Sequence, residues 1–428
     1  MSSFKIIVKK EFLLLKTLLT IIYIAMEMYY SYFISEQYDY MGFIPDLNLL
    51  KYAITKVVFL LLLIGSFNLY NQSKFLYSIY LLLIFFFYIP NAILFSFSNF
   101  PTGPFVSNAF FVSFFLITPY IKFPIPDLSI PVKYKGLTLI SIALLLLIPI
   151  LLTFKLNINL RTLLLSEIYE TRETFSKNLH GILAYFYNLE AKTIIPVSLV
   201  FFMISRRYFF IGLLLLLLLY LFVISGNKLV YFTSIIVVFF FYIGRSHVSK
   251  LSNFFLIVLI FFALVPIIDN FIFKINLLGG TFINRFLFIP ALTTQFYFDF
   301  FDGNPFYFAE SHFFNHFVHS PYDMPIGFLI TKVYWGDSTA FANNGIVSDG
   351  FMNLGYIGVI LFSAIFIFLF SLFNSFRLHK GYYGIFFCYI YIILSAPLLT
   401  CLITGGIFLF ILLSILILNN RKSISIST

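Results

Sequence analysis

The chain has 428 residues, of which 61% are hydrophobic and only 10% are charged, and its formal net charge at pH 7 is +10. So much apolar sequence with so few charges excludes a soluble globular enzyme. Apolar runs of roughly 17 to 25 residues recur from end to end, which is the length that an α-helix needs to cross a bilayer. We therefore expect an all-α polytopic membrane protein with a single integral membrane domain, residues 1–428.

The hydrophobic runs predict about twelve transmembrane helices. They cover residues 13–33, 52–70, 75–97, 105–121, 136–154, 182–204, 208–224, 229–243, 252–270, 346–373, 382–399 and 403–419. Basic residues precede the first run as in a secretion signal, but Lys16 interrupts it and no small-residue cleavage site follows, so we expect an uncleaved first span. The predicted span at 182–204 contains two charged residues, Glu190 and Lys192.

The distribution of basic residues predicts the orientation of the chain. In a soluble protein the positive net charge would suggest a nucleic-acid partner, but here Lys and Arg gather in short loops on alternate sides of the spans, so we expect none. Placing both termini in the cytoplasm puts more than half of the 27 Lys and Arg residues on the cytoplasmic side. The other side then receives a charged loop at 155–180 and a large loop at 271–345, between the ninth and tenth spans.

The predicted outer loop 271–345 is the longest polar stretch between the spans. Its ionisable residues include Arg285, Asp299, Asp302, Glu310, His312, His316, His319, Asp323 and Asp337. Ionisable groups are costly in lipid, so a protein with few of them is expected to concentrate its chemistry or recognition where they gather. Asp299 and Asp302 equally fit caps or turns.

Three basic residues are candidates for holding an anion. Arg172 lies in a charged segment where Glu173 and Lys177 stand four residues apart, a pattern that also fits a solvated helix with local ion pairs. Lys228 follows a tight turn in an apolar stretch, and snorkelling to the interface would also explain it. Arg285 has no acidic residue within a helical turn or two. An arginine fork suits a phosphate or diphosphate because it donates two parallel charge-assisted hydrogen bonds.

Histidine and glutamate residues in the outer loop are candidates for proton transfer. His312, His316 and His319 stand at i, i+4 and i+7, which on a helix would place them on one face able to hold a metal. The same residues fit a wet interfacial loop, and no acidic residue completes a pattern such as H-E-x-x-H, so we expect no metal. Glu310, His312 and His319 are the candidate bases, because imidazole and a partly desolvated carboxylate can each accept a hydroxyl proton.

Short motifs around the two predicted outer loops occur in a recognisable order. Along the chain these are Tyr169-x-x-Arg172, Tyr185, Pro196, Arg206-Arg207, Ser225-Gly226-x-Lys228, Arg285 with Pro290, Tyr297-x-Asp299-Phe300-Phe301, Asn304-Pro305, Ser311-His312, Asn343-x-Gly345 and Asp349-Gly350-x-x-Asn353-Leu354-Gly355-x-x-Gly358. No single motif is specific. In their joint order, over about residues 160–360, the chain resembles the Wzy-type O-antigen, or oligosaccharide repeat-unit, polymerases of bacterial surface polysaccharide pathways.

The resemblance implies a GT-C-like fold and a glycosyltransferase at the outer face of the bacterial inner membrane. Its donor and acceptor would be polyprenyl-diphosphate-linked oligosaccharides, and its expected partners are membrane lipids, a chain-length regulator and a flippase. No cofactor is implied, and a divalent metal is not expected because the first outer loop, with Glu36 and Asp39, lacks the paired acidic motif that metal-dependent enzymes of this kind carry. Under this resemblance Arg172, Arg285 and Lys228 bind the diphosphate, and the catalytic residues are Arg172 and Arg285 with a base among His312, Glu310 and His319.

Two other functions remain open. The nearest alternative is an O-antigen ligase, which uses the same donor and a similar outer loop but passes the glycan to lipid A core. A different class is a lipid-linked oligosaccharide flippase or transporter, which needs no large loop outside the membrane and keeps its polar residues within the spans. The concentration of His, Arg and acidic residues in one loop argues against this class.

Overall fold

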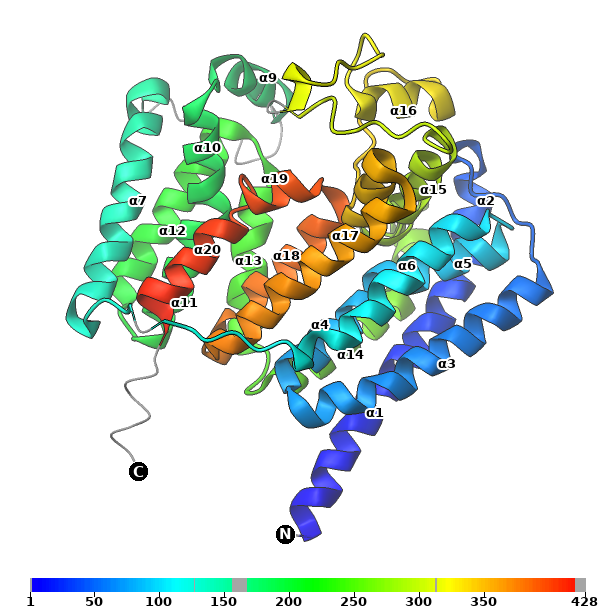
Figure 1. The fold of residues 1–428 in the computed structure, drawn as a ribbon, viewed down its shortest axis with the longest axis horizontal. Helices are drawn as coiled ribbons and strands as arrows, with labels where there is room; N and C mark the ends of the chain where they lie inside the picture. The colour runs from blue at the N-terminus through cyan, green and yellow to red at the C-terminus, as the bar shows by residue number, and fades with distance from the viewer. Residues whose placement is uncertain (1, 127, 156–167, 312–313, 420–428) are drawn as a thin grey trace. The chain divides into compact units, whose positions relative to one another are not determined.

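The computed structural model describes residues 2–126, 128–155, 168–311 and 314–419 (Figure 1). The structure is 80% helical, and no strand occurs in these ranges. Ten of its described helices are long and apolar enough to cross a membrane, where the sequence predicted about twelve. The predicted spans at 229–243 and 382–399 contain shorter apolar helices, Phe232–Tyr242 and Lys380–Ser395. The all-α polytopic class is therefore confirmed, with fewer full-length spans than predicted.

The chain forms two compact units, each assembled from separate stretches of sequence. The first unit comprises Met1–Lys122, Ser246–Asn374 and Ile390–Leu398, and the second comprises Phe123–Arg245, Ser375–Tyr389 and Leu399–Thr428. Arg285 and Glu310 belong to the first unit, whereas Arg172 belongs to the second.

The first unit contains a span, Lys74–Phe97, in which residues 76–96 are all buried. This span is apolar on all sides, which is typical of a helix surrounded by other helices. The helices of this unit are α1 (Ser2–Tyr29), η1 (Tyr30–Ile34), α2 (Ser35–Gln37), η2 (Asp39–Met41), α3 (Leu49–Gln72), α4 (Lys74–Leu83), η3 (Ile84–Tyr88), α5 (Ile89–Phe97), α6 (Thr102–Phe114), η4 (Phe115–Tyr120), α14 (His247–Ile268), η6 (Asp269–Phe273), η7 (Gly279–Phe288), α15 (Ile289–Phe300), η8 (Phe314–His316), α16 (Ile326–Trp335) and α17 (Ile346–Phe376), whose last two residues belong to the second unit.

The second unit packs around an apolar core that includes Ile150, Ala191, Leu199, Phe202 and Leu218. These residues come from three of its spans, which face one another with aliphatic and aromatic side chains. The helices that lie in this unit are α7 (Val132–Phe154), α9 (Ile168–Asn178), α10 (Ile182–Leu189), η5 (Glu190–Ile194), α11 (Ile195–Ile204), α12 (Tyr208–Ser225), α13 (Lys228–Tyr242), η9 (Lys380–Tyr382), α20 (Ile407–Leu413) and η10 (Ser414–Leu418), while α18 (Tyr383–Ser395) and α19 (Leu398–Leu402) have residues in both units.

The predicted outer loop 271–345 is substantially helical. The π-helix η7 and the α-helix α15 follow each other without a break from Gly279 to Phe300, and residues 290–298 are all buried. The sequence prediction treated this segment as a loop because polar residues such as Arg285, Thr294 and Gln295 interrupt its apolar runs. Arg285 therefore lies on a helix that is packed into the first unit.

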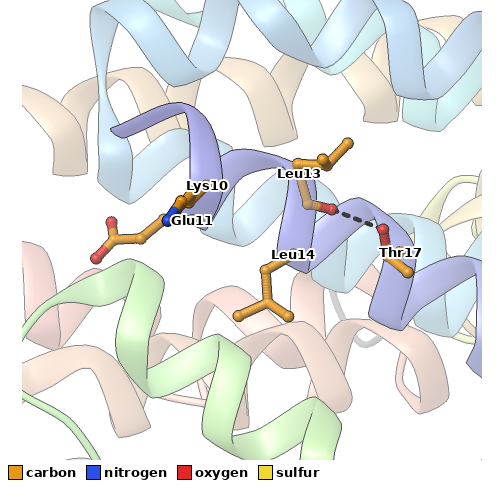
Figure 2. A pocket seen from close by; sticks show the side chains of 5 residues that line it. All are labelled: Lys10, Glu11, Leu13, Leu14 and Thr17. Carbon is orange, nitrogen blue, oxygen red and sulfur yellow. Dashed lines mark hydrogen bonds between the residues drawn. The ribbon is translucent and has the colours of Figure 1, made fainter. Parts of the chain in front are cut away.

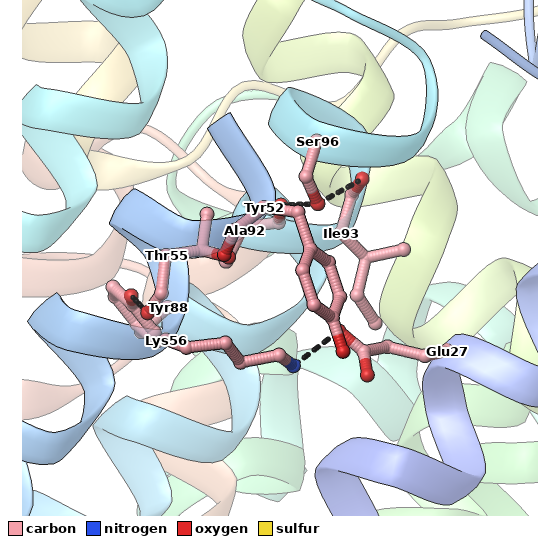
Figure 3. A network of polar contacts seen from close by, with 8 residues as sticks. All are labelled: Glu27, Tyr52, Thr55, Lys56, Tyr88, Ala92, Ile93 and Ser96. Atoms are coloured by element: carbon pink, nitrogen blue, oxygen red, sulfur yellow. Dashed lines mark hydrogen bonds and ion pairs between the residues drawn. The ribbon is translucent and has the colours of Figure 1, made fainter. Parts of the chain in front are cut away.

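A buried ion pair shows how the first unit accommodates charge within its spans. Lys56 of α3 pairs with Glu27 of α1 (Figure 3). The Lys56 ammonium also lies 3.5 Å from the centre of the Tyr23 ring. Close by, the Tyr88 hydroxyl donates to the Thr55 carbonyl at 2.5 Å. The Lys56 ammonium and the Glu27 carboxylate thus neutralise each other, as burial of charge in an apolar environment requires.

Candidate functional site

Arg172 is exposed on α9 and contacts the turn that precedes α13. Its Nε donates to the Gly226 carbonyl oxygen at 2.9 Å. Gly226 ends α12 in the left-handed conformation, with φ of +58°, which glycine adopts without strain. The two terminal guanidinium nitrogens of Arg172 make no hydrogen bond or ion pair with any residue in the described ranges. The hydrogen bond from Nε thus fixes the side chain, and the two terminal nitrogens remain available to bind an anion.

The local ion pairing predicted for the charged helix is confirmed. Lys177 pairs with Glu173 at 2.7 Å, both side chains are exposed, and the ammonium lowers the pKa of the Glu173 carboxyl. This pairing occupies the acidic group next to Arg172 along the chain. Arg172 itself is therefore not neutralised by the carboxylate that the sequence places beside it.

Lys228, the third candidate cation, is the first residue of α13. Its side chain lies outside the described residues, so its predicted contact with a diphosphate stays a prediction. The turn that Arg172 contacts leads directly into this helix. The first backbone N–H groups of a helix lack partners within it and carry partial positive charge, which favours a phosphate. The second unit therefore gathers the Arg172 fork and the positive end of α13 around one turn.

Arg285 is exposed on η7 in the first unit, and among the described residues it makes no hydrogen bond or ion pair. Its charge is felt by Tyr38: burial raises the pKa of this phenol, Tyr40 and Asp269 raise it further, and Arg285 lowers it. Arg285 and Asp269 therefore both lie within electrostatic range of the same tyrosine. The sequence had placed no acid near Arg285, because Asp269 is sixteen positions earlier in the chain.

The Asp269 carboxylate accepts hydrogen bonds at the start of the helical segment that carries Arg285. Its two oxygens accept from the backbone N–H groups of Leu278 at 2.9 Å and Gly279 at 2.8 Å. Glycine is required here, since a Cβ at Gly279 would lie 1.6 Å from the Tyr29 hydroxyl. Because Asp269 is buried and satisfied by these bonds, it orders the segment and leaves Arg285 without an ion pair.

Glu310 is exposed and its Oε1 accepts from the Ile326 backbone N–H at 2.5 Å. The carboxylate therefore caps the first turn of α16, where partial positive charge is expected. Partial burial raises the pKa of Glu310, and this hydrogen bond offsets part of that rise. A carboxylate with a raised pKa is a stronger proton acceptor than an ordinary one, so the capping role and the predicted role as a base are compatible.

The predicted histidine face is not formed as a helix. Within the described part of 312–319, only Phe314–His316 is helical, as a short 3-10 turn, so His316 and His319 do not share one continuous helix. His312 lies outside the described residues, and its role as a base stays a prediction. His319 is exposed. Of the two interpretations that the sequence allows, a helical face and a wet interfacial loop, the described residues 314–319 favour the loop, because a three-residue turn is too short to form a stable helical face.

The motif from Asp349 to Gly358 supports the segment that leads to Glu310. Asn353 accepts from the Phe308 backbone N–H at 2.7 Å and donates to the Asp349 carboxylate at 2.9 Å. Tyr307 and Phe308 both have positive φ, of 50° and 60°, which is strained for residues with side chains. Asn353 thus holds two strained residues in place shortly before Glu310. Sequence reasoning noted this motif but assigned it no contact.

Asp299 and a pocket on the first helix are accounted for by local structure. Asp299 accepts from the Tyr334 hydroxyl at 2.5 Å, and the Tyr334 ring stacks on Phe296 at 4.2 Å. A pocket in the first unit is lined by Lys10, Glu11, Leu13, Leu14 and Thr17, all on the first helix (Figure 2). The Thr17 hydroxyl already donates to the Leu13 carbonyl at 3.0 Å. A single helix that presents mainly apolar groups is poorly suited to bind a charged substrate.

The candidate residues thus form two groups. The first unit holds Arg285 with Glu310 and His319, and the second unit brings Arg172 to the turn before Lys228. Because the arginines belong to different units, their predicted convergence on one diphosphate stays a prediction. Comparison of the chain with models of protein families, with curated proteins and with solved structures gives no match.

Proposed function

We propose that the protein is a metal-independent glycosyltransferase that polymerises polyprenyl-diphosphate-linked oligosaccharide repeat units. Its product would be O-antigen or a related surface polysaccharide, made at the outer face of the bacterial inner membrane. The observation that carries the proposal concerns the Arg172 side chain. Its Nε donates a hydrogen bond to the Gly226 carbonyl oxygen, while its two terminal nitrogens have no partner among the described residues. The resemblance described above supplies the reaction class.

The reaction breaks the bond between the anomeric carbon of the donor glycan and the lipid diphosphate. Positive charge develops on the sugar and negative charge on the leaving diphosphate, while a hydroxyl of the acceptor repeat unit forms the new glycosidic bond and loses its proton. Cations that are already in position stabilise the leaving group more in the transition state than in the ground state. They therefore raise the rate and not only the affinity.

Arg172 is suited to this task because its position is fixed before substrate binds. The hydrogen bond from Nε to Gly226 limits rotation of the guanidinium, so less conformational entropy is lost when the terminal nitrogens bind phosphate oxygens. The N-terminus of α13 adds partial positive charge at the same turn. Arg285 offers a second exposed guanidinium in the first unit, without a neutralising carboxylate among the described residues.

Glu310 and His319 are the described candidates for removing the proton from the acceptor hydroxyl. Glu310 has a pKa raised by partial burial, which brings its basicity closer to that of a group poised for proton transfer near neutral pH. His319 is exposed on the same predicted outer loop. His312 is the third candidate, on the sequence alone.

The proposal is tested by replacing Arg172 in a strain that lacks the chromosomal gene. Arg172→Ala is expected to leave surface lipopolysaccharide with a core capped by one repeat unit, whereas Lys177→Ala, on the same helix and also exposed, should restore the full ladder of chain lengths. Chain length is read on a gel and protein level by immunoblot. A normal ladder from Arg172→Ala at a normal protein level would contradict the proposal.

The deletion strain itself separates the proposal from its alternatives. Loss of a polymerase leaves core capped by one repeat unit. Loss of a ligase leaves bare core while lipid-linked polymer accumulates, and loss of a flippase leaves bare core without that polymer. In a host that builds capsule, the same comparison is made on lipid-linked intermediates.

A further inference from the structure

Glu190 is a fully buried carboxyl group in the middle of a membrane span. It lies in Ile182–Ile204, its exposed fraction is 0%, and neither carboxyl oxygen has a hydrogen-bond partner in the described structure. An ionised carboxylate without a partner at this depth is strongly disfavoured, so the neutral acid is the stable form. Intramembrane acids of this kind usually mark a functional site.

The other buried acids in the described ranges each have a donor. Glu27 pairs with Lys56 in α3 (Figure 3). Asp269 accepts from two backbone N–H groups, and Asp349 accepts from the Leu398 N–H at 2.7 Å and from Asn353. Burial alone therefore does not explain Glu190, since the protein satisfies its other buried carboxylates with cations or N–H groups.

Among the described side chains, no cation forms an ion pair with Glu190. The element that carries it, η5, packs against α7, α10, α11, α13 and α20. Lys192 on η5 itself is two residues away, and side chains at i and i+2 do not face each other on a helix. The titratable residues on the packed elements are Lys133, Tyr134 and Lys135 in the first turn of α7, Tyr185 and Tyr187 in α10, and Tyr242 at the end of α13, together with Lys228 and Tyr231, whose side chains lie outside the described residues. Lys135 already donates to the Asn419 carbonyl at 3.1 Å.

Two irregular segments meet beside Glu190 within the second unit. The π-helix η5 covers Glu190–Ile194, and π-helical turns are frequent at functional sites. The span Leu398–Leu418 breaks between α19, which ends at Leu402, and α20, which begins at Ile407. A Cβ at Gly406, in this break, would lie 1.8 Å from the Thr193 hydroxyl on η5. The break therefore abuts the π-helix directly.

The break begins at an exposed residue and ends at buried ones. Ile403 is 45% exposed, whereas Gly405 and Gly406 are buried. Backbone that leaves the helical conformation at membrane depth is tolerated where protein covers it or where it borders a water-filled path, and broken spans commonly accompany ion and proton sites.

From this arrangement we propose that the Glu190 carboxyl is an exchangeable proton-binding site inside the membrane, reached where the broken span Leu398–Leu418 meets η5. The ligand is a proton, and the reaction is reversible loss of that proton from the carboxylic acid to water. The proposal makes no use of glycan chemistry. It therefore stands or falls independently of the proposed polymerase.

Infrared difference spectroscopy on the purified full chain in lipid tests the site directly. The wild-type spectrum minus that of Glu190→Gln is expected at pH 7 to show the carbonyl band of a protonated carboxyl, and heavy water should shift that band within minutes. Absence of the band would overturn the proposal, as would a band that heavy water does not shift. A band that appears only in Lys228→Met would show that Glu190 is ionised beside Lys228, which also overturns it.

A covalent label supplies a test that needs no variant to fold. Dicyclohexylcarbodiimide dissolves in lipid and adds the O–H of a protonated carboxyl across one of its C=N bonds, and the adduct rearranges to a stable N-acylurea. At pH 7 we expect mass spectrometry to find Glu190 labelled at least tenfold more than Glu27, the ion-paired acid that serves as the internal control. Equal labelling of Glu190 and Glu27 would show that the lack of an ion-pair partner does not keep Glu190 protonated, and this result would contradict the proposal.

Discussion

Replacing Arg285 tests whether its exposed guanidinium, which has no ion pair among the described residues, acts on the substrate. Its side chain makes no hydrogen bond or ion pair in the described structure, so removing it should cost little stability. We expect Arg285→Ala to lower polymer formation on the order of 100-fold, the usual effect of losing one donor to a developing negative charge. Lys332→Ala, an exposed cation elsewhere in the predicted outer loop, should leave the polymer ladder unchanged. A normal ladder from Arg285→Ala at normal protein level would remove Arg285 from the site.

Glu310 has two possible roles that a pair of substitutions separates. Glu310→Gln keeps an oxygen that can accept from the Ile326 N–H but cannot take a proton, whereas Glu310→Ala loses both functions. If Glu310 is the base, both variants lose transfer activity. If it only caps α16, Glu310→Gln retains activity and Glu310→Ala loses thermal stability.

The raised pKa of Glu310 also predicts a pH dependence. A base must be deprotonated, so transfer measured in purified membranes should rise with pH through a midpoint above 4.5, the ordinary value for glutamate. The raised pKa means that the folded state binds this proton more tightly than the unfolded state, so the contribution of Glu310 to stability falls as pH rises through its folded pKa. Asp302→Asn, an exposed acid in the same loop, should not move the midpoint.

At the scale of elements, the bend in α17 depends on glycines that allow its backbone to fold closely. The helix is interrupted at Leu354 and Gly355, where Gly355 has φ of +61°, and a Cβ at Gly358 would lie 1.9 Å from the Gly350 carbonyl oxygen. Gly358→Ala therefore requires a backbone shift and should cost roughly 1–3 kcal/mol, seen as a lower unfolding temperature in detergent. Gly212→Ala, where nothing lies within 4 Å, is the matched control and should be neutral or stabilising. Equal unfolding temperatures for the two variants would contradict the close approach of position 358 to the Gly350 carbonyl oxygen.

The elements that the sequence predicted well are those defined by uninterrupted apolar runs. The span 75–97, for example, corresponds to the buried helix Lys74–Phe97. The helix Gly279–Phe300 was missed because Arg285 and several polar side chains break its apolar pattern, although its neighbours in the fold bury residues 290–298. Local hydrophobicity does not report burial that depends on packing between distant segments.

The same limit applies to the candidate site. Residue type and local charge were enough to select Arg172 and Arg285 as exposed cations, because neither requires a partner far along the chain. The contacts that position them could not be predicted, since Arg172 reaches Gly226 across 54 residues and Asp269 caps the start of η7 through a turn of its own. The unpartnered state of Glu190 is likewise a property of the packed helices and has no signature in the sequence.

For the whole molecule, the proposed reaction requires both arginines on one side of the membrane. Single cysteines introduced at exposed positions report the side of the membrane on which each position lies, once the buried Cys388 and Cys401 have been replaced by Ser. Lys177→Cys reports the side of Arg172 and Lys274→Cys the side of Arg285, because each exposed lysine is close in sequence to its arginine. Lys380→Cys reports a loop that the positive-inside rule assigns to the cytoplasm.

A membrane-impermeant maleimide added to intact spheroplasts should label the cysteines at 177 and 274 and should label the one at 380 only after lysis. This pattern follows from the charge bias of the loops, and an additional or missing span before residue 155 would invert the predictions for both 177 and 274. Labelling of 177 and 274 from opposite sides would mean that no single diphosphate can meet both guanidinium groups. The polymerase mechanism would then have to depend on one arginine alone, and only one of Arg172→Ala and Arg285→Ala would lower polymer formation.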